Sequence, residues 1–455
     1  MDAFEMDHLA GELDALVLAL DEERWRHVAG LEHEPALERL FAARSRAAHK
    51  ESVAALRADG NDDLAARVAM LRAERAQATD EEAWRAADSA ASGIGPDGPA
   101  PLAELELAVP RERNPDRRAA LARAAAEAMA RPASLREAAA ETRARARAEV
   151  GLAPDWKVVV EGDQALAASD DAYRDVLEFL ARRTLAPLPK GGLARADLLR
   201  VASAPEYDGL FRAGMLAITV KWTLEPLGLD AGRLRIDDDA RRAKWPGAHA
   251  VGARVSYRPR GGAGDWQDLL AALARALAAA AQRPRARDAV LAEALAWLLG
   301  SVLTEPRWLA ERADVERRHA ADVVRALAFR RLVALRADAA ALRVATEVQR
   351  GLSGEAWREA HEAALTAATG AAWDPVRASR DDDAARLAAA IAGAGAGEAL
   401  RRAVRERFDE DWWRNPRTAA HLAALLAAGR LPETETPPPA AEASRMLVEK
   451  LEGRG

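Results

Sequence analysis

The stretch RPRGGAGDWQDLLAALARALAAAAQ, residues 258–282, decides how the rest of this 455-residue chain is interpreted. Two glycines follow a strand-like segment, and Asp265 is predicted to be the N-cap of a helix. Leucines at helical spacing predict that one face of this helix is buried: Leu269, Leu270, Leu273 and Leu277. The neighbouring face is almost bare, with Ala271, Ala272, Arg275 and Ala278. The helix therefore has the setting of an active-site element but few chemical groups.

The composition fits a folded, mainly helical protein. Half of the residues are hydrophobic, yet no run approaches the roughly 20 apolar residues that a membrane span needs. The N-terminal residues 1–20 are acidic and amphipathic, which is not typical of a signal peptide. We therefore expect a cytoplasmic protein with no membrane partner.

The absence of cysteine and the distribution of charge exclude several kinds of site. The chain has no cysteine, so it has no disulfide, thiolate metal site or cysteine nucleophile. The net charge is -6 with both signs interspersed, and no basic stripe is seen, so we expect no nucleic-acid partner. None of the eight histidines stands four residues from another, as a helical zinc-binding pair would.

Most of the chain has apolar residues every three or four positions, which predicts helices. We expect antiparallel helices over residues 7–88, a Gly/Pro loop at 91–101, a helix over 114–150 interrupted near Pro132, and a helix over 170–186. The run AGAGAGE, with Gly393, Gly395 and Gly397, predicts a flexible interruption of a helix. Residues 432–443 predict an extended linker before a short terminal helix.

Two stretches favour strands. Residues 155–162, DWKVVVEG, are β-branched and bounded by turn residues. Residues 249–262 alternate Val251, Ala253, Val255 and Tyr257 with small or charged residues, and lead directly into the helix described above. The predicted fold class is mainly α with one small β-sheet beside that helix.

The junction between this strand and the helix resembles the zinc metallopeptidases of the thimet oligopeptidase and oligoendopeptidase F clan, and in particular their bacterial "M3-like" branch. Four segments carry the resemblance, in order and at similar spacing: DDDARRAKWPGAHAV, the turn Arg258–Gly262, EALAWLLGSVLTEPRWL and RERFDEDWWRNPRTAAHLAALLAAGR. Together they cover roughly residues 190–430. The resemblance implies a zincin-like helical clamshell of the oligopeptidase type.

In that clan the helix carries His-Glu-x-x-His, in which two histidines bind zinc and the glutamate activates the bound water. The resemblance places the first histidine at Ala271, the glutamate at Ala272 and the second histidine at Arg275. It places the third ligand, a glutamate on the next helix, at Glu293. Alanine has no ligand atom, and arginine is a permanent cation. These vestigial positions predict no metal, no cofactor and no catalytic residue.

The clan also places oxyanion-stabilising tyrosines in the region that corresponds to residues 379–400 here. That region has no tyrosine, and the whole chain has only Tyr173, Tyr207 and Tyr257. Because ligands, base and oxyanion donors are missing together, the chain is predicted to be a non-catalytic pseudopeptidase.

The resemblance divides the chain into three predicted parts. These are an N-terminal helical lobe over residues 1–190, a degenerate catalytic-type lobe over 191–431, and a Pro-rich linker with a terminal helix over 432–455. Within the second lobe, a carboxylate at Glu293 without zinc would be costly to bury alone. We therefore expect an ion pair between Arg275 and Glu293 in place of the metal.

Three functions stay open at this level. The first is binding of a peptide, or of a partner protein such as an active paralogue, along the strand. The residues predicted to bind are Val251, Ala253, Val255, Tyr257 and Arg275. The second is residual or altered peptidase activity. The third is a structural role, with the cleft filled by side chains such as Trp266, Leu270 and Arg275.

Overall fold

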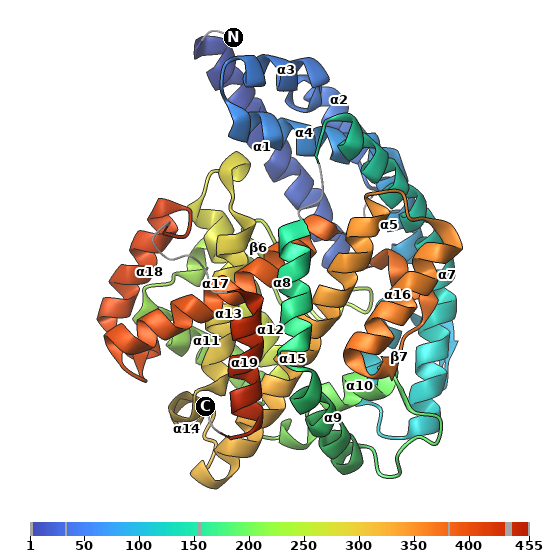
Figure 1. Cartoon of the computed structure of the whole chain (residues 1–455), viewed down its shortest axis with the longest axis vertical. Coiled ribbons are helices and arrows are strands. Elements are labelled where there is room, and N and C mark those ends of the chain that lie inside the picture. The colour runs from blue at the N-terminus through green and yellow to red at the C-terminus, as the bar shows by residue number, and fades with distance from the viewer. Residues whose placement is uncertain (1–2, 32–33, 153–155, 381–382, 433–438, 454–455) are drawn as a thin grey trace.

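The computed structural model describes residues 3–31, 34–152, 156–380, 383–432 and 439–453. It is mainly helical, as predicted, and its described residues form three small sheets where one was expected (Figure 1). Helices α1–α4 form one end of the molecule, and the long helix α7 runs down one side (Figure 1). The elements of this N-terminal part are α1 (Ala3–Val28), α2 (Leu37–Ala43), α3 (Lys50–Ala58), α4 (Asp62–Ala76), α5 (Ala78–Ala90), β1 (Ser92–Gly95), β2 (Gly98–Pro101), α6 (Leu102–Ala108) and α7 (Pro115–Glu149).

The remaining helices and strands build the larger body of the molecule. Up to the helix quoted at the outset they are α8 (Trp156–Ala167), α9 (Asp170–Thr184), β3 (Leu193–Ala194), α10 (Arg195–Ala202), α11 (Ala213–Leu224), β4 (Arg235–Asp237), β5 (Ala248–Val251), β6 (Arg254–Tyr257) and α12 (Ala263–Ala281). After it come α13 (Ala289–Ser301), α14 (Pro306–Arg312), α15 (Arg317–Val348), α16 (Gly354–Thr369), β7 (Ala371–Ala372), α17 (Ala384–Phe408), α18 (Pro416–Ala428) and α19 (Ala440–Leu451).

Two predictions about the N-terminal part need correction. The Gly/Pro stretch at 91–101 does end a helix, but it forms the antiparallel hairpin β1–β2 rather than a loop. Helix α7 is continuous through Pro132 instead of being interrupted there. Pro132 is buried on the packed face of α7, so tertiary packing offsets the backbone hydrogen bond that proline removes.

The predicted strand at 155–162 is wrong, because the described residues from Trp156 onward form helix α8. Asp155 lies outside the described residues. In α8 the buried positions are Val159, Gly162 and Ala165. A Cβ on Gly162 would stand 3.3 Å from the Cβ of Ala339 on α15. Packing against α15 at helical spacing therefore overrides the β preference of the three valines.

The second predicted strand is two strands. Residues Ala248–Val251 and Arg254–Tyr257 form the antiparallel hairpin β5–β6, and β4 pairs with β6 in parallel. The strand order is β4-β6-β5, so β6 is the central strand. The reversal occurs at Gly252, whose φ of +56° is a left-handed conformation that glycine adopts without strain. The sheet still leads into α12, as predicted.

The hydrophobic cores connect segments that are far apart in the sequence. Helices α8 and α9 contribute to cores shared with α15, and α19 contributes to the same two cores. The divisions predicted at residues 190 and 432 therefore do not coincide with boundaries between cores, and the three-part division stays a prediction. Residues 433–438 of the predicted linker lie outside the described residues, and the terminal helix is α19.

Within the described ranges, no single helix is both long and apolar enough to cross a membrane. Two consecutive segments, Ala289–Thr304 and Pro306–Arg312, have the length and apolar composition of a membrane span only when taken together, and they meet at a bend of 72°.

Candidate binding site

Helix α12 is positioned by the turn before it. Gly261 and Gly262 have φ values of +83° and +96°, which side chains other than glycine rarely adopt. A Cβ on Gly261 would stand 2.8 Å from the carbonyl oxygen of Phe211, and the amide of Gly262 donates a 2.7 Å hydrogen bond to that oxygen. The two glycines are therefore required for the chain to pass closely by α11 as it enters α12.

Asp265 is not the N-cap of this helix, because the helix starts at Ala263 and the cap position is Gly262. Asp265 lies in the first turn, and its carboxylate accepts hydrogen bonds of 3.1 Å from the backbone amide and the guanidinium of Arg260. The side chain of Asp265 thus links the preceding Arg258–Gly262 turn to the first turn of α12. A carboxylate at this end also interacts favourably with the helix dipole.

Arg275 on α12 forms the predicted pair with Glu293 on α13. Nε and Nη2 of Arg275 donate hydrogen bonds of 2.8 Å each to Oε1 and Oε2 of Glu293. This two-point geometry is the strong form of an arginine–carboxylate contact. Burial lowers the pKa of Arg275, but the charge and hydrogen bonds of Glu293 more than offset this and raise the pKa above its usual value. The predicted proximity of the two charges is confirmed.

Helix α17 lies directly against the segment that carries Glu293, and glycines make this approach feasible. A Cβ on Gly397 would stand 2.5 Å from the Cβ of Trp297 and 2.7 Å from the carbonyl oxygen of Ala294. A Cβ on Gly393 would overlap the Cβ of Glu293. The predicted interruption at this glycine run is therefore wrong: α17 is continuous from Ala384 to Phe408. The small residues serve helix packing instead of flexibility.

A cavity of about 350 Å³ opens beside this pair. Its walls come from α12, α13, α15 and α17, among other segments, and include Ala271, Arg275, Glu293 and Trp297. Trp266 and Leu270, two side chains that were candidates to fill it, are instead 2% and 1% exposed in the hydrophobic core. Space for a ligand therefore remains at the bare face of α12.

A second cavity of about 210 Å³ adjoins the first along α12. The two share Leu199, Asp268 and Arg330. Nη2 of Arg330 donates a 2.7 Å hydrogen bond to Oδ2 of Asp268, and the charge of Asp268 raises the pKa of Arg330. Together they form a groove, which we call the α12 groove, from the Gly261–Gly262 turn to the Arg275–Glu293 pair.

Sequence reasoning missed Asp268 and Arg330. Asp268 could have been found, because it precedes Ala271 by three residues and Arg275 by seven and therefore shares their helix face. Arg330 belongs to α15, and nothing in its local sequence indicates that it reaches α12. Among the described residues, the sequence pattern thus identifies one wall of the groove but not the wall that faces it.

The predicted binding strand is only partly placed at this groove. Val255 is fully buried and Tyr257 is 7% exposed, both on the central strand β6. The segment before the edge strand β5 reaches the groove through Pro246 and Gly247, whereas no residue of β5 itself is among the described residues that line it. The prediction that residues 251–257 form an open edge is therefore wrong for β6, because β4 and β5 occupy its two sides.

None of the three tyrosines lines the α12 groove. The hydroxyl of Tyr173 donates a 2.8 Å hydrogen bond to the carbonyl oxygen of Thr369, and that of Tyr207 accepts one of 3.3 Å from Arg183. Tyr257 lines a different cavity, on the other side of α12. The groove therefore has no phenol to donate a hydrogen bond.

The donor set of the groove can be compared with what zinc requires. Zinc sites use histidine, cysteine and carboxylate ligands, usually three or four of them. Here Ala271 offers no donor, and Ala272, predicted to share the bare face, is instead fully buried in the hydrophobic core. Arg275 carries a fixed positive charge, and both oxygens of Glu293 accept hydrogen bonds from Arg275. In the part of the chain that the structure describes, no group of three or more histidine, aspartate or glutamate side chains is arranged to hold a metal ion. The residues at this position do not fit a zinc ion.

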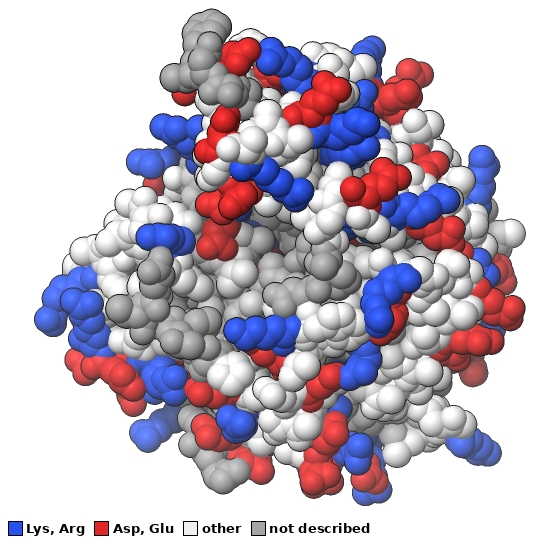
Figure 2. Space-filling model, turned by 45° about the horizontal axis from the view of Figure 1, so that its top comes forward, with Lys and Arg blue, Asp and Glu red and all other residues white. Residues whose placement is uncertain are grey.

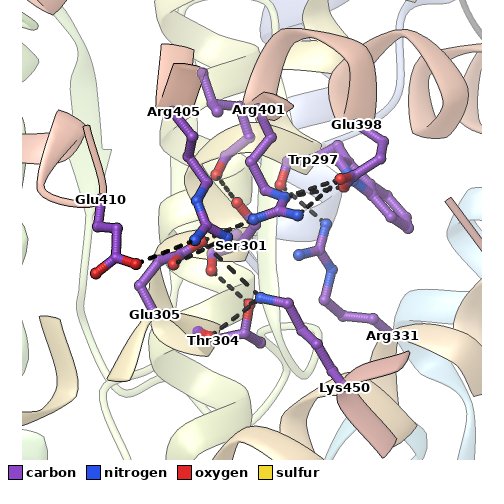
Figure 3. A network of polar contacts seen from close by, with 12 residues as sticks. Trp297, Ser301, Thr304, Glu305, Arg331, Glu398, Arg401, Arg405, Glu410 and Lys450 are labelled. Carbon is purple, nitrogen blue, oxygen red and sulfur yellow. Dashed lines mark hydrogen bonds and ion pairs between the residues drawn. The ribbon is translucent and has the colours of Figure 1, made fainter. Parts of the chain in front are cut away.

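A buried network of charges supports the wall of the groove (Figure 3). Nη2 of Arg331 donates a 2.9 Å hydrogen bond to the carbonyl oxygen of Trp297, and Nε1 of Trp297 donates one of 3.3 Å to Glu398. Arg401 then joins Glu398 to Glu305 through hydrogen bonds of 3.0 Å. Burial lowers the pKa of Arg331 to about 9. The network fixes two residues that line the groove, Trp297 and Arg331.

The same network holds the terminal helix. Nζ of Lys450 on α19 is buried and donates hydrogen bonds of 2.7 Å to the Oγ1 of Thr304 and 3.1 Å to its carbonyl oxygen. Glu305 lies 3.9 Å from the ammonium group. Burial lowers the pKa of Lys450 to about 7.

The surface does not segregate charge on the face shown in Figure 2, where basic and acidic side chains alternate. This agrees with the interspersed charges of the sequence. It leaves the predicted absence of a nucleic-acid partner as a prediction.

The helical body with its small sheets has the fold of oligopeptidase-type peptidases. The structure is similar to PZ peptidase A, solved with an inhibitor, at a TM-score of 0.59 and 14% identity over 95% of this chain and 86% of that one. It is similar to a structure assigned as oligoendopeptidase F from Bacillus anthracis str. Ames, at 0.53 and 14% over 100% and 86% of the two chains. It is also similar to the M32 carboxypeptidase of Deinococcus radiodurans R1, at 0.51 and 14% over 99% and 100%.

No protein-family profile matches the sequence, and no curated protein matches it. The likeness to the solved peptidases is thus one of fold, and it confirms the fold expected from the resemblance.

Proposed function

We propose that this protein is a non-catalytic member of the oligopeptidase-type fold that binds a peptide segment in the α12 groove. The observation that carries the proposal is the Arg275–Glu293 pair, which stands at the position where the resemblance places zinc ligands. The pair neutralises a charge that would otherwise be left unpaired, and it does so without the metal that hydrolysis in this clan uses.

The groove has features suited to an extended polypeptide. Alanines such as Ala271 leave space along α12, and Trp297 adds an aromatic surface. The paired charges of Asp268 and Arg330 stand where the two cavities meet. Segments that bind peptides commonly combine an apolar surface with a few placed polar groups, and edge strands such as β5 can add backbone hydrogen bonds. A partner protein would contribute its segment in the same way.

The second candidate is an active peptidase, favoured by the peptidase fold of the similar structures. The two candidates differ in what happens to a bound peptide. The experiment is to incubate the purified full chain, with and without added zinc, with a mixture of short peptides and to follow binding and cleavage by mass spectrometry. Intact bound peptides support the proposal. Cleavage that a chelator abolishes supports the second candidate.

The third function left open, a structural role with a filled cleft, loses its main support. Of the three side chains expected to fill the cleft, Trp266 and Leu270 lie in the hydrophobic core instead, and Arg275 lines a cavity of about 350 Å³ that stays open beside it. A native pull-down of the protein from its own cells, with bound species identified by mass spectrometry, separates a protein partner such as an active paralogue from free peptides.

A further inference from the structure

We propose that the protein has a second ligand site, for an amphipathic small molecule with an alkyl chain and a neutral polar end, in a cavity on the opposite side of α12 from the groove. This inference does not depend on the proposed function. Leu269 and Leu273 of α12 line this cavity, whereas Ala271 and Arg275 line the groove. The helix therefore separates two distinct sites.

The cavity has the size and lining of a small-molecule site. Its volume is about 640 Å³, within the range of typical ligand pockets. It lies between α11, β4, β6 and α12, and its walls are mainly aliphatic. The aliphatic side chains are Val220, Leu224, Leu229, Ile236, Leu269 and Leu273. An alkyl chain would replace water against these walls, which favours binding through burial of apolar surface.

One side chain that lines this cavity can donate a hydrogen bond. Tyr257 lines it, and in the described part of the chain its hydroxyl is not among the fully buried groups that lack a partner, so the group is accessible from the cavity. Burial raises the pKa of Tyr257, so the hydroxyl is protonated at neutral pH and can donate. A ligand with an accepting oxygen would replace water at this hydroxyl.

The charges around the cavity select the ligand's polar end. Lys221, Glu225 and Asp230 are the charged residues that line it. Lys221 lies 3.5 Å from Glu225, and Asp230 lies 3.5 Å from Arg233, both as exposed pairs. The ammonium and both carboxylates that line the cavity are thus already paired. An anionic end would lose its hydration without meeting an unpaired cation, which disfavours it, whereas the hydroxyl of Tyr257 can donate to a neutral acceptor. The geometry points to an uncharged alcohol or amide.

The probes are octanol and octanoate, which share a chain and differ in their polar end. Binding to the full chain is measured by isothermal titration calorimetry, with the thermal midpoint as a second readout. Octanol should bind, and octanoate should bind more weakly. Ala217 lines the cavity from an exposed position on α11, so Ala217→Trp should abolish binding by occluding the cavity. Ala86→Trp, at an exposed position on α5, is the matched control and should bind octanol normally.

Tyr257→Phe tests the polar contact, because it removes the hydroxyl and keeps the ring. It should weaken octanol binding by roughly three- to tenfold, as expected for one neutral hydrogen bond. The inference is overturned if octanol does not bind, if Ala217→Trp binds it as well as the control does, or if octanoate binds more tightly than octanol. Unchanged affinity in Tyr257→Phe overturns the role of the hydroxyl.

Discussion

Arg275 on α12 and Glu293 on α13 are joined by two parallel hydrogen bonds of 2.8 Å, and both side chains line the α12 groove. The two helices are adjacent in sequence and pack closely, so the pair ties together the two elements that form this wall. The pair therefore links these two helices through side chains of this chain alone.

Replacing Arg275 with alanine should destabilise the protein by about 1–2 kcal/mol, because it leaves the partly buried carboxylate of Glu293 without its cation. The estimate is reduced for solvent screening, since the Arg275 side chain is 37% exposed. Urea unfolding of Arg275→Ala, Glu293→Ala and the double variant gives the coupling between them. We expect a coupling of about 1 kcal/mol. Strictly additive effects would show that the pair contributes nothing.

The register of α12 can be tested by building a metal site. The double variant Ala271→His with Arg275→His places two histidines four residues apart beside the freed carboxylate of Glu293, and it leaves the buried Ala272 unchanged. It should bind one equivalent of zinc, measured by equilibrium dialysis and elemental analysis. The control variant Leu270→His with Ala274→His has the same spacing on buried positions and should not. If the control binds zinc and the variant at 271 and 275 does not, the register is wrong.

Close packing of α17 on α13 predicts a large effect at Gly397. Gly397→Ala should destabilise the protein by about 2–3 kcal/mol, because the added methyl group overlaps backbone and side-chain atoms of α13. The matched control is Gly11→Ala on α1, where a Cβ would meet nothing within 4 Å. There alanine should stabilise the helix by about 0.5–1 kcal/mol. Thermal and urea unfolding distinguish the two, and equal effects would refute the packing role.

The buried amine of Lys450 predicts a dependence of stability on pH. Its pKa is about 7 in the folded protein and 10.5 as the ordinary value, so the unfolded state binds more protons between these limits. Stability therefore rises with pH across this window, and the penalty for burying the charge is complete below pH 7. Lys450→Met should remove this dependence. The free energy of unfolding of the wild type minus that of the variant should increase from about pH 6 to about pH 9.5. A difference that stays constant would contradict the burial of a charged amine.

The sequence predicts the chemistry of α12 better than it predicts the groove around it. The spacing of Ala271, Arg275 and Glu293 follows from helix periodicity and one resemblance, and the structure places Arg275 and Glu293 in contact. Arg330 could not be predicted, because its position depends on how α15 crosses α12. Contacts between distant helices are set by packing that no local pattern records.

The errors in secondary structure have the same origin. The valines of α8 and the glycines of α17 were assigned by local preference, as strand and as flexible interruption. In the fold, Gly162 of α8 meets Ala339 of α15, and Gly397 of α17 meets Trp297 of α13. In both cases a neighbouring helix, invisible in the local sequence, decides the conformation.

The proposed binding of peptides in the α12 groove without cleavage is tested by mass spectrometry of the wild-type protein mixed with short peptides, zinc and, in parallel, a chelator. We expect intact peptides bound to the protein, with the same amount bound in zinc and in chelator, and weaker binding after Ala271→Trp fills the groove. Peptide fragments that form with zinc and disappear with the chelator would contradict it.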